Sequence, residues 1–205
     1  MKVHLGCGRK FWPGWWNVDG SPASVADEVC NLLDYEPRAP VDSCAAIHVL
    51  EHLAEDDCRK LVERVHGWLV PGGQFIVEMP DRDKCLLAAQ TAHPPTSGPY
   101  LWDHPAIQGL GGLLGDRPAV HEAWVVWLAG NSSTVVSGVL RGDYESFLPQ
   151  EFNSRFENHR CVWSEHDFSD VMRAAGFRVS AETPQYHGKR SHRDMRLVGI
   201  KGTVG

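Results

Sequence analysis

The chain has 205 residues, 42% of them hydrophobic, and a formal net charge of −6, which suits one α/β domain with a substantial core. The negative charge argues against a general nucleic-acid binder, because phosphate groups need a basic surface. The six cysteines include no CxxC pair, no stretch reaches 18 apolar residues, and no charged and then apolar leader begins the chain, so we expect a cytoplasmic protein with reduced thiols and no membrane span.

The first predicted unit is a strand, a turn and a second strand over residues 2–19 (KVHLGCGRKFWPGWWNVD). Val3 and Leu5 can face the interior, and the GCG turn that follows lets the backbone pass close to a ligand. In an open α/β sheet such a turn supplies backbone N–H groups, and an acid at the end of the next strand accepts hydrogen bonds from ribose hydroxyl groups. Asp19 is placed for that role. It follows Gly8 by eleven residues, which is too soon for a dinucleotide-binding fingerprint.

The next segments alternate between strand and helix patterns. Residues 29–33 predict a short third strand, and residues 43–50 predict a buried fourth strand. Apolar residues at helical spacing over residues 54–70 predict an amphipathic helix, which residues 71–73 (PGG) are expected to stop. Residues 74–80 then predict a fifth strand.

Residues 93–160 carry no comparable pattern, being long, glycine-punctuated and aromatic. We expect this segment to form a cap over the site that binds the acceptor, because long inserts in compact domains are usually functional. The regular pattern returns at Ser164, a predicted helix N-cap, and that helix is expected to stop at Gly176. Residues 177–181 and 195–201 predict the last two strands.

Two of these segments resemble the motifs of class I S-adenosylmethionine-dependent methyltransferases. The first comprises LGCG, PGW and NVD within residues 5–19, and the second comprises HVLEHL from residue 48, the amphipathic helix, PGG and a strand ending in MPD at residue 81. The resemblance implies an α/β, Rossmann-like sheet of seven mostly parallel strands with one antiparallel member, and an insertion after strand 5. All 205 residues would form one domain. His4 departs from the acid common at its position, and Lys10 replaces the usual third glycine.

The same resemblance implies a cofactor and a reaction. The cofactor is S-adenosyl-L-methionine, released as S-adenosyl-L-homocysteine, and the methyl acceptor is a small molecule such as a saccharide or a natural-product intermediate. The residues implied for cofactor binding are Leu5, Gly6, Cys7, Gly8, Asp19, Gly20, Asn31, Leu32 and His48. No nucleic-acid or membrane partner is expected, and the oligomeric state is not predicted.

The end of the fourth strand faces the sulfur of the cofactor in this architecture. His48, Glu51 and His52 are therefore the candidate catalytic residues, with His52 as the first choice for a base, since histidine titrates near neutral pH. A base in the insertion is the alternative, and its candidates are His104, His121 and His159.

Two other functions remain open at this point. The chain could be a methyltransferase-like module that binds the nucleotide without catalysis and serves in an interaction. It also matches the HxxEH pattern of zinc peptidases at residues 48–52, a chemistry that requires His48 and His52 on one helical face. His48 ends a strand-like run instead, so no metal site is assigned.

Overall fold

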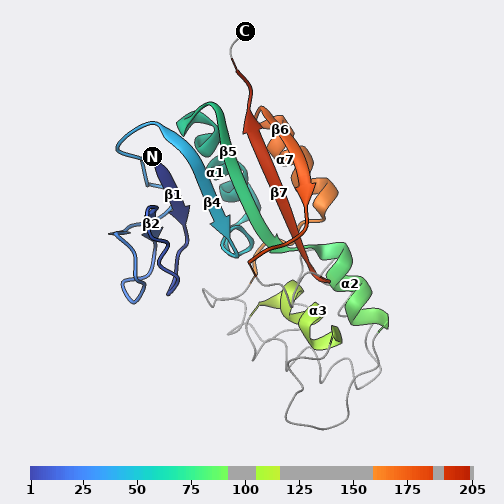
Figure 1. Cartoon of the computed structure of the whole chain (residues 1–205). Helices are drawn as coiled ribbons and strands as arrows, with labels where there is room; N and C mark the ends of the chain where they lie inside the picture. Colours follow the sequence, from blue (N-terminus) through green and yellow to red (C-terminus); the bar gives the residue numbers. More distant parts are fainter. Residues whose placement is uncertain (92–104, 116–158, 187–191, 204–205) are drawn as a thin grey trace.

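The computed structural model describes residues 1–91, 105–115, 159–186 and 192–203. These residues form one seven-stranded sheet in the order β3-β2-β1-β4-β5-β7-β6 (Figure 1). The strands are β1 (Lys2–Leu5), β2 (Trp16–Asp19), β3 (Glu28–Val29), β4 (Val41–Ile47), β5 (Leu69–Pro80), β6 (Phe177–Glu182) and β7 (Asp194–Lys201). The helices are the 3-10 helix η1 (Leu50–His52) and the α-helices α1 (Glu55–Trp68), α2 (Arg82–Thr91), α3 (Pro105–Leu114) and α7 (Glu165–Ala174).

The direction of the strands matches the predicted fold class. β1 pairs in parallel with β2 and β4, β2 with β3, and β4 with β5, whereas β7 runs antiparallel to both β5 and β6. The expected seven-stranded, mostly parallel α/β sheet with one antiparallel member is therefore confirmed.

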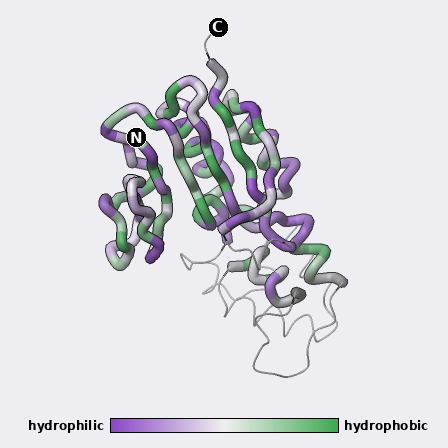
Figure 2. Tube along the Cα trace, viewed as in Figure 1, coloured by the Kyte–Doolittle hydropathy of each residue, from purple (hydrophilic) through white to green (hydrophobic). Residues whose placement is uncertain are grey.

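The core lies between the central strands and two helices. α1 and α7 pack against each other and against the strands on one face of the sheet (Figure 1). β4 and β5 are apolar over much of their length (Figure 2), and Cys44 of β4 and Phe75 and Val77 of β5 are fully buried. Leu61 and Val65 of α1 and Phe168 of α7 are fully buried, and each such side chain stabilises the fold by roughly 1.5–3 kcal/mol.

Two predicted boundaries are wrong for local reasons. The third strand does not extend over residues 29–33: β3 ends at Val29, since the Asn31 side chain accepts a hydrogen bond from Leu33 N at 3.0 Å and turns the backbone. The fourth strand ends at Ile47 rather than at residue 50, because His48 has a left-handed φ of 51°.

The predicted helix stop at residues 71–73 is also wrong. α1 ends at Trp68, and the PGG segment lies inside β5. Pairing between β4 and β5 shifts there from Val41 opposite Leu69 to Ser43 opposite Gln74. The extra residues of β5 interrupt its hydrogen-bond ladder with β4. Gly72, which has φ of 80°, allows the backbone conformation that this irregularity requires.

The segment around Ser164 is as predicted. The Ser164 hydroxyl accepts a hydrogen bond from Asp167 N at 3.1 Å and caps α7. Of the predicted cap over residues 93–160, only residues 105–115 and 159–160 are described, and the rest lies outside the described residues. Within the described part, α3 packs on α2 beyond the end of β5 (Figure 1).

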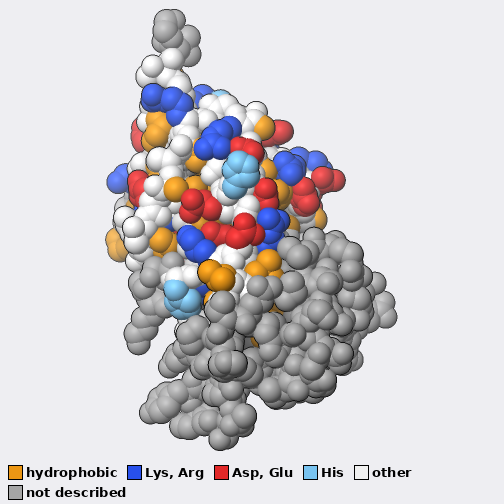
Figure 3. All heavy atoms as spheres, turned by 90° about the vertical axis from the view of Figure 1, so that its right-hand side faces the viewer, with side chains coloured by type: hydrophobic (Ala, Val, Ile, Leu, Met, Phe, Trp, Pro, Cys, Tyr) orange, Lys and Arg blue, Asp and Glu red, His pale blue; other side chains and the backbone are white. Residues whose placement is uncertain are grey.

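The described surface carries charges of both signs. On the face shown in Figure 3, acidic and basic side chains are intermingled rather than gathered by sign. On α7, for example, Arg173 lies 2.7 Å from Asp170. Among the described residues, no helix is both long enough and apolar enough to cross a membrane.

Candidate functional site

The candidate site lies at one edge of the sheet. The carboxyl ends of the parallel strands β1, β2, β4 and β5 meet there, and β7 begins there because it runs in the opposite direction. Asp19, His48 and Asp194 stand at or directly beside these strand ends. Ligands of open α/β sheets bind at this edge.

The GCG turn is shaped by close contact and by internal hydrogen bonds. A Cβ atom at Gly6, which has φ of 66°, would overlap the Val49 side chain, so only glycine fits. Gly6 N and Cys7 N both donate to Val18 O, at 2.8 and 3.2 Å. The predicted supply of backbone N–H groups is therefore not seen for these amides, whose donors are used inside the protein.

Asp19 is the centre of this turn. Its Oδ2 accepts a hydrogen bond from Gly8 N and its Oδ1 one from Ser21 N, both at 2.7 Å. Each carboxylate oxygen has two acceptor positions, so both oxygens keep capacity for a ligand hydroxyl. Burial, reinforced by the charge of Asp19, raises the pKa of the neighbouring Cys7 thiol to about 11, so the thiol stays protonated.

The other residues predicted for the cofactor have different environments. Leu5 and Leu32 are buried members of the main core. Gly20 is exposed next to Asp19. Asn31 is exposed, and its carbonyl accepts hydrogen bonds from the backbone of residues 34 and 35.

Residues 12–15 between β1 and β2 form a loop, the tryptophan loop, that packs against His4 of β1. The Trp12 ring stacks on the buried His4 ring with centroids 4.0 Å apart. Asn17 holds this loop, since its Oδ1 accepts from Trp12 N at 2.9 Å and its Nδ2 donates to Trp15 O at 2.9 Å. Asn17 of the NVD motif therefore stabilises the conformation of the tryptophan loop.

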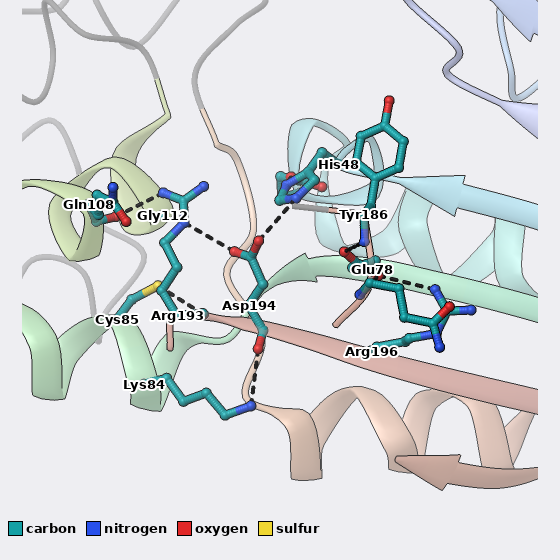
Figure 4. Close-up of polar contacts among 12 residues, drawn as sticks. His48, Glu78, Lys84, Cys85, Gln108, Gly112, Tyr186, Arg193, Asp194 and Arg196 are labelled. Atoms are coloured by element: carbon teal, nitrogen blue, oxygen red, sulfur yellow. Dashed lines mark hydrogen bonds and ion pairs between the residues drawn. The ribbon is translucent and has the colours of Figure 1, made fainter. Parts of the chain in front are cut away.

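His48 lies between two buried carboxylates, from which a charge network extends into β7 (Figure 4). His48 Nδ1 is 3.2 Å from Glu51 Oε1, and His48 Nε2 is 3.2 Å from Asp194 Oδ2. Arg193 Nε lies 3.1 Å from the other oxygen of Asp194. Burial opposes a charge on His48, but the hydrogen bonds and charges of Asp194 and Glu51 outweigh it and raise the pKa of His48 to about 9. At neutral pH this ring is an imidazolium, which donates hydrogen bonds and does not take up a proton.

Glu51 also faces the point where the chain returns from the insertion. Burial disfavours its charge, but His48 dominates and lowers the pKa of Glu51 to about 2. His159 Nε2 lies 4.0 Å from Glu51 Oε1, and the His52 and His159 rings meet edge to face with centroids 4.9 Å apart. Burial, only partly offset by Glu51, lowers the pKa of His159 to about 4, so this ring is neutral. His104 and His121, the other candidate bases of the insertion, lie outside the described residues.

A second charge network fixes the chain after β6. Glu78 is fully buried and lies 3.1 Å from Arg196 Nη1. It also accepts hydrogen bonds from Gln185 N and Tyr186 N, at 3.0 and 2.8 Å (Figure 4). These bonds bring Tyr186 near the tryptophan loop, where its ring centroid is 6.1 Å from that of Trp12.

The structure therefore brings together Gly8 with Asp19, His48 with Glu51, and His52 with Glu51 and His159. It adds Asp194, Arg193, Glu78 and Tyr186, which were not predicted. The direction of the last strand could have revealed Asp194, because an antiparallel final strand starts at the edge where the parallel strands end. The other contacts join residues that are far apart in the chain, so the sequence contains no local pattern that predicts them.

The HxxEH interpretation does not fit this geometry. His48 lies outside η1 and has a left-handed backbone, so it does not share a helical face with His52. Both of its ring nitrogens lie against carboxylates. The histidine pair of a zinc peptidase is therefore not formed.

A scan against protein-family models finds no match, and a search of curated proteins finds no similar sequence. Solved structures do share the fold. PH0226 from Pyrococcus horikoshii OT3 has a TM-score of 0.54 at 13% identity, covering 98% of this chain and 81% of that one. DhpI with bound SAH has a TM-score of 0.53 at 14% identity, covering 98% and 76%.

A third similar structure is the Burkholderia thailandensis 1,6-didemethyltoxoflavin-N1-methyltransferase, with 1,6-didemethyltoxoflavin and S-adenosylhomocysteine bound. Its TM-score is 0.52 at 14% identity, covering 98% of this chain and 70% of that one. At these identities the likeness concerns the fold. The chain shares the Rossmann-like α/β fold of these structures.

Proposed function

We propose that this chain transfers a methyl group from S-adenosylmethionine to a small-molecule acceptor. The observation that carries the proposal is the position of Asp19, held by Gly8 N at 2.7 Å at the edge of the sheet where the parallel strands end. The DhpI structure holds SAH, and the Burkholderia thailandensis methyltransferase holds S-adenosylhomocysteine together with 1,6-didemethyltoxoflavin. Both facts support the cofactor and the acceptor class.

The residues at this edge suit the cofactor. Bound S-adenosylmethionine would supply a methyl group that is already activated on sulfur. Asp19 would accept hydrogen bonds from the ribose hydroxyls, and the open Gly8, which has no neighbour within 4 Å of a Cβ position, would leave room for the ligand. Asn31 and Leu32 are proposed beside the adenine, and His48 beside the methionine end.

The acceptor is proposed to bind at the end of β4. The protein has to hold it in line with the methyl carbon and keep water out. Both ring nitrogens of His48 lie 3.2 Å from a carboxylate oxygen, and the raised pKa keeps the ring protonated at neutral pH, so His48 suits orientation rather than proton uptake. His52 is less buried than Glu51 and is the proposed acceptor contact.

Calorimetry with S-adenosylhomocysteine tests the cofactor site. Asp19→Ala should weaken binding at least about 100-fold, because two charge-assisted hydrogen bonds of about 1.5–3 kcal/mol each are lost. Asp56→Ala, which removes an exposed carboxylate from α1, should bind like the wild type. If wild type takes up no ligand, or if Asp19→Ala binds as tightly, the proposal fails.

A change in the ligand guards against misfolding of Asp19→Ala, since Asp19 also holds the turn. The 2′-deoxy analogue of S-adenosylhomocysteine should bind wild type more weakly than the parent compound, and Asp19→Ala should not distinguish the two. Tight binding combined with no turnover across a panel of hydroxyl and amine acceptors would favour the non-catalytic module instead.

A further inference from the structure

Three side chains with metal-ligating atoms meet where the chain returns from the insertion to the sheet. Glu51 and His52 belong to η1, directly after β4, and His159 precedes α7. One ligand atom of each residue lies within 4.8 Å of the other two. We propose that Glu51, His52 and His159 form a binding site for one divalent transition-metal ion of the Zn²⁺, Co²⁺ or Fe²⁺ class.

Backbone hydrogen bonds hold His159 at this point. Arg160 N and Cys161 N both donate to Glu51 O, at 2.7 and 3.3 Å. His159 Nδ1 lies 2.8 Å from Gly112 O, and since a carbonyl only accepts, Nδ1 carries the proton. The lone pair is then on Nε2, the atom that faces Glu51. A histidine ligand that donates its other N–H to a backbone carbonyl is the usual arrangement at metal sites.

The carboxylate of Glu51 gives independent support for a bound cation. Its side chain is only 3% exposed, and among the described residues its Oε2 has no hydrogen-bond partner. A buried carboxylate oxygen without a partner is costly. The other oxygen lies against His48, whose ring is held in turn by Asp194. His48 would therefore act as a positioning residue that orients the ligand carboxylate.

The donor set selects the kind of ion. Two imidazole nitrogens and one carboxylate suit Zn²⁺ and its neighbours, whereas Mg²⁺ and Ca²⁺ prefer oxygen ligands alone. In tetrahedral coordination, ligand bonds of about 2.0–2.2 Å place neighbouring ligand atoms roughly 3.3–3.6 Å apart. Ligand atoms within 4.8 Å of one another therefore have to approach by up to about 1.2–1.5 Å around the ion, and His52 is the partly exposed member of the three, the other two being buried.

Three protein ligands leave an open position, which water or an acceptor oxygen would fill. Metal binding itself does not depend on methyl transfer. A role for the ion in lowering the pKa of an acceptor hydroxyl rests on the proposed function, because only then does the acceptor lie at this end of β4.

The test is metal binding by tag-free protein that has been stripped with a chelator and desalted. Titration with Co²⁺ should give visible d–d absorption that saturates at one ion per chain, and Zn²⁺ should abolish it by displacement. His159→Asn and His52→Asn should each weaken Co²⁺ binding at least about 100-fold. His48→Asn should weaken it by about 10–100-fold, as expected for a partner of a ligand.

His166→Asn is the matched control, because it removes an imidazole that is 81% exposed on α7, and it should bind Co²⁺ like the wild type. Circular dichroism and S-adenosylhomocysteine calorimetry on the same samples report folding and the cofactor site separately. Folded wild type that binds no Co²⁺, or His52→Asn and His159→Asn proteins that bind it fully, would overturn the metal site while leaving the cofactor proposal intact.

Discussion

At the scale of single residues, His48 stands out because it is the only described residue other than glycine with a positive φ. Its φ of 51° is unusual for a residue with a side chain and costs of order 1 kcal/mol. The backbone is held there by the hydrogen bond from His48 N to Glu78 O at 2.8 Å. With His48 protonated, Glu51, Asp194 and Arg193 make the buried group electrically balanced, which avoids the large cost of an unpaired buried charge.

His4 gives a prediction at the same scale. It is 1% exposed, and burial lowers its pKa despite opposing effects of Asn17 and Asp19. Below about pH 6.5 the unfolded chain therefore protonates this histidine to a greater extent than the folded chain does. The free energy of unfolding should therefore fall as the pH is lowered below 6.5, by at most about 1.4 kcal/mol per pH unit from this group.

Denaturant unfolding of wild type and His4→Gln at pH 7 and pH 5.5 measures this effect. The variant should lose less stability between the two values, and the difference isolates His4 from other histidines such as His159. The exposed His166→Gln should behave like the wild type. Equal losses in wild type and His4→Gln would contradict the assignment of a depressed pKa to His4.

At the scale of elements, one buried carboxylate ties three strands together. Glu78 of β5 pairs with Arg196 of β7, and Arg196 lies 3.1 Å from Glu182 of β6. The backbone of residues 185 and 186 also donates to Glu78. This network directs the chain after β6 toward the edge where the parallel strands end, near the tryptophan loop.

Arg196→Met should lower the free energy of unfolding by about 3 kcal/mol or more, because it leaves Glu78 buried without its cation. Glu182→Gln is the control: Glu182 is 42% exposed, and exposed ion pairs contribute less than about 1 kcal/mol. Denaturant midpoints of the two variants give the comparison. Similar small losses for both would mean that the hydrogen bonds from residues 185 and 186 suffice for Glu78.

At the scale of the whole molecule, the site draws on residues from both ends of the chain. Asp19 comes from β2 and Asp194 from β7, and the sheet order brings the ends of these strands to one edge. A ligand that contacts this edge binds only the folded chain, so it must stabilise the entire fold.

The thermal transition tests this linkage. S-adenosylhomocysteine at 100 times its dissociation constant should add about 2.7 kcal/mol to the free energy of unfolding, which corresponds to a rise in Tm of roughly 5–10 °C for a chain of this size. An equimolar mixture of adenosine and homocysteine should give a much smaller shift, since the two halves are no longer linked. Equal shifts would argue against one continuous site.

Local patterns were enough to predict much of this molecule. Val3 and Leu5 alternate correctly with polar neighbours, Asp19 ends its strand, and Ser164 caps its helix. These features depend on residues a few positions apart, whose hydrogen bonds and burial follow from secondary structure alone. The sheet class followed because two local motifs in order resemble one family.

The remaining features depend on contacts that sequence distance conceals. His159 reaches Glu51 across 108 residues of chain, and Arg196 reaches Glu78 across 118. The sequence predicted a strand through His48, whereas in the structure His48 has a left-handed φ and its N–H donates to Glu78 O of the neighbouring strand β5. The charge balance around His48, the protonation of the histidine rings and the grouping of metal-ligating atoms were decided only by the tertiary structure. Electrostatic energy depends on the distance between groups and on their burial, and not on their order along the chain.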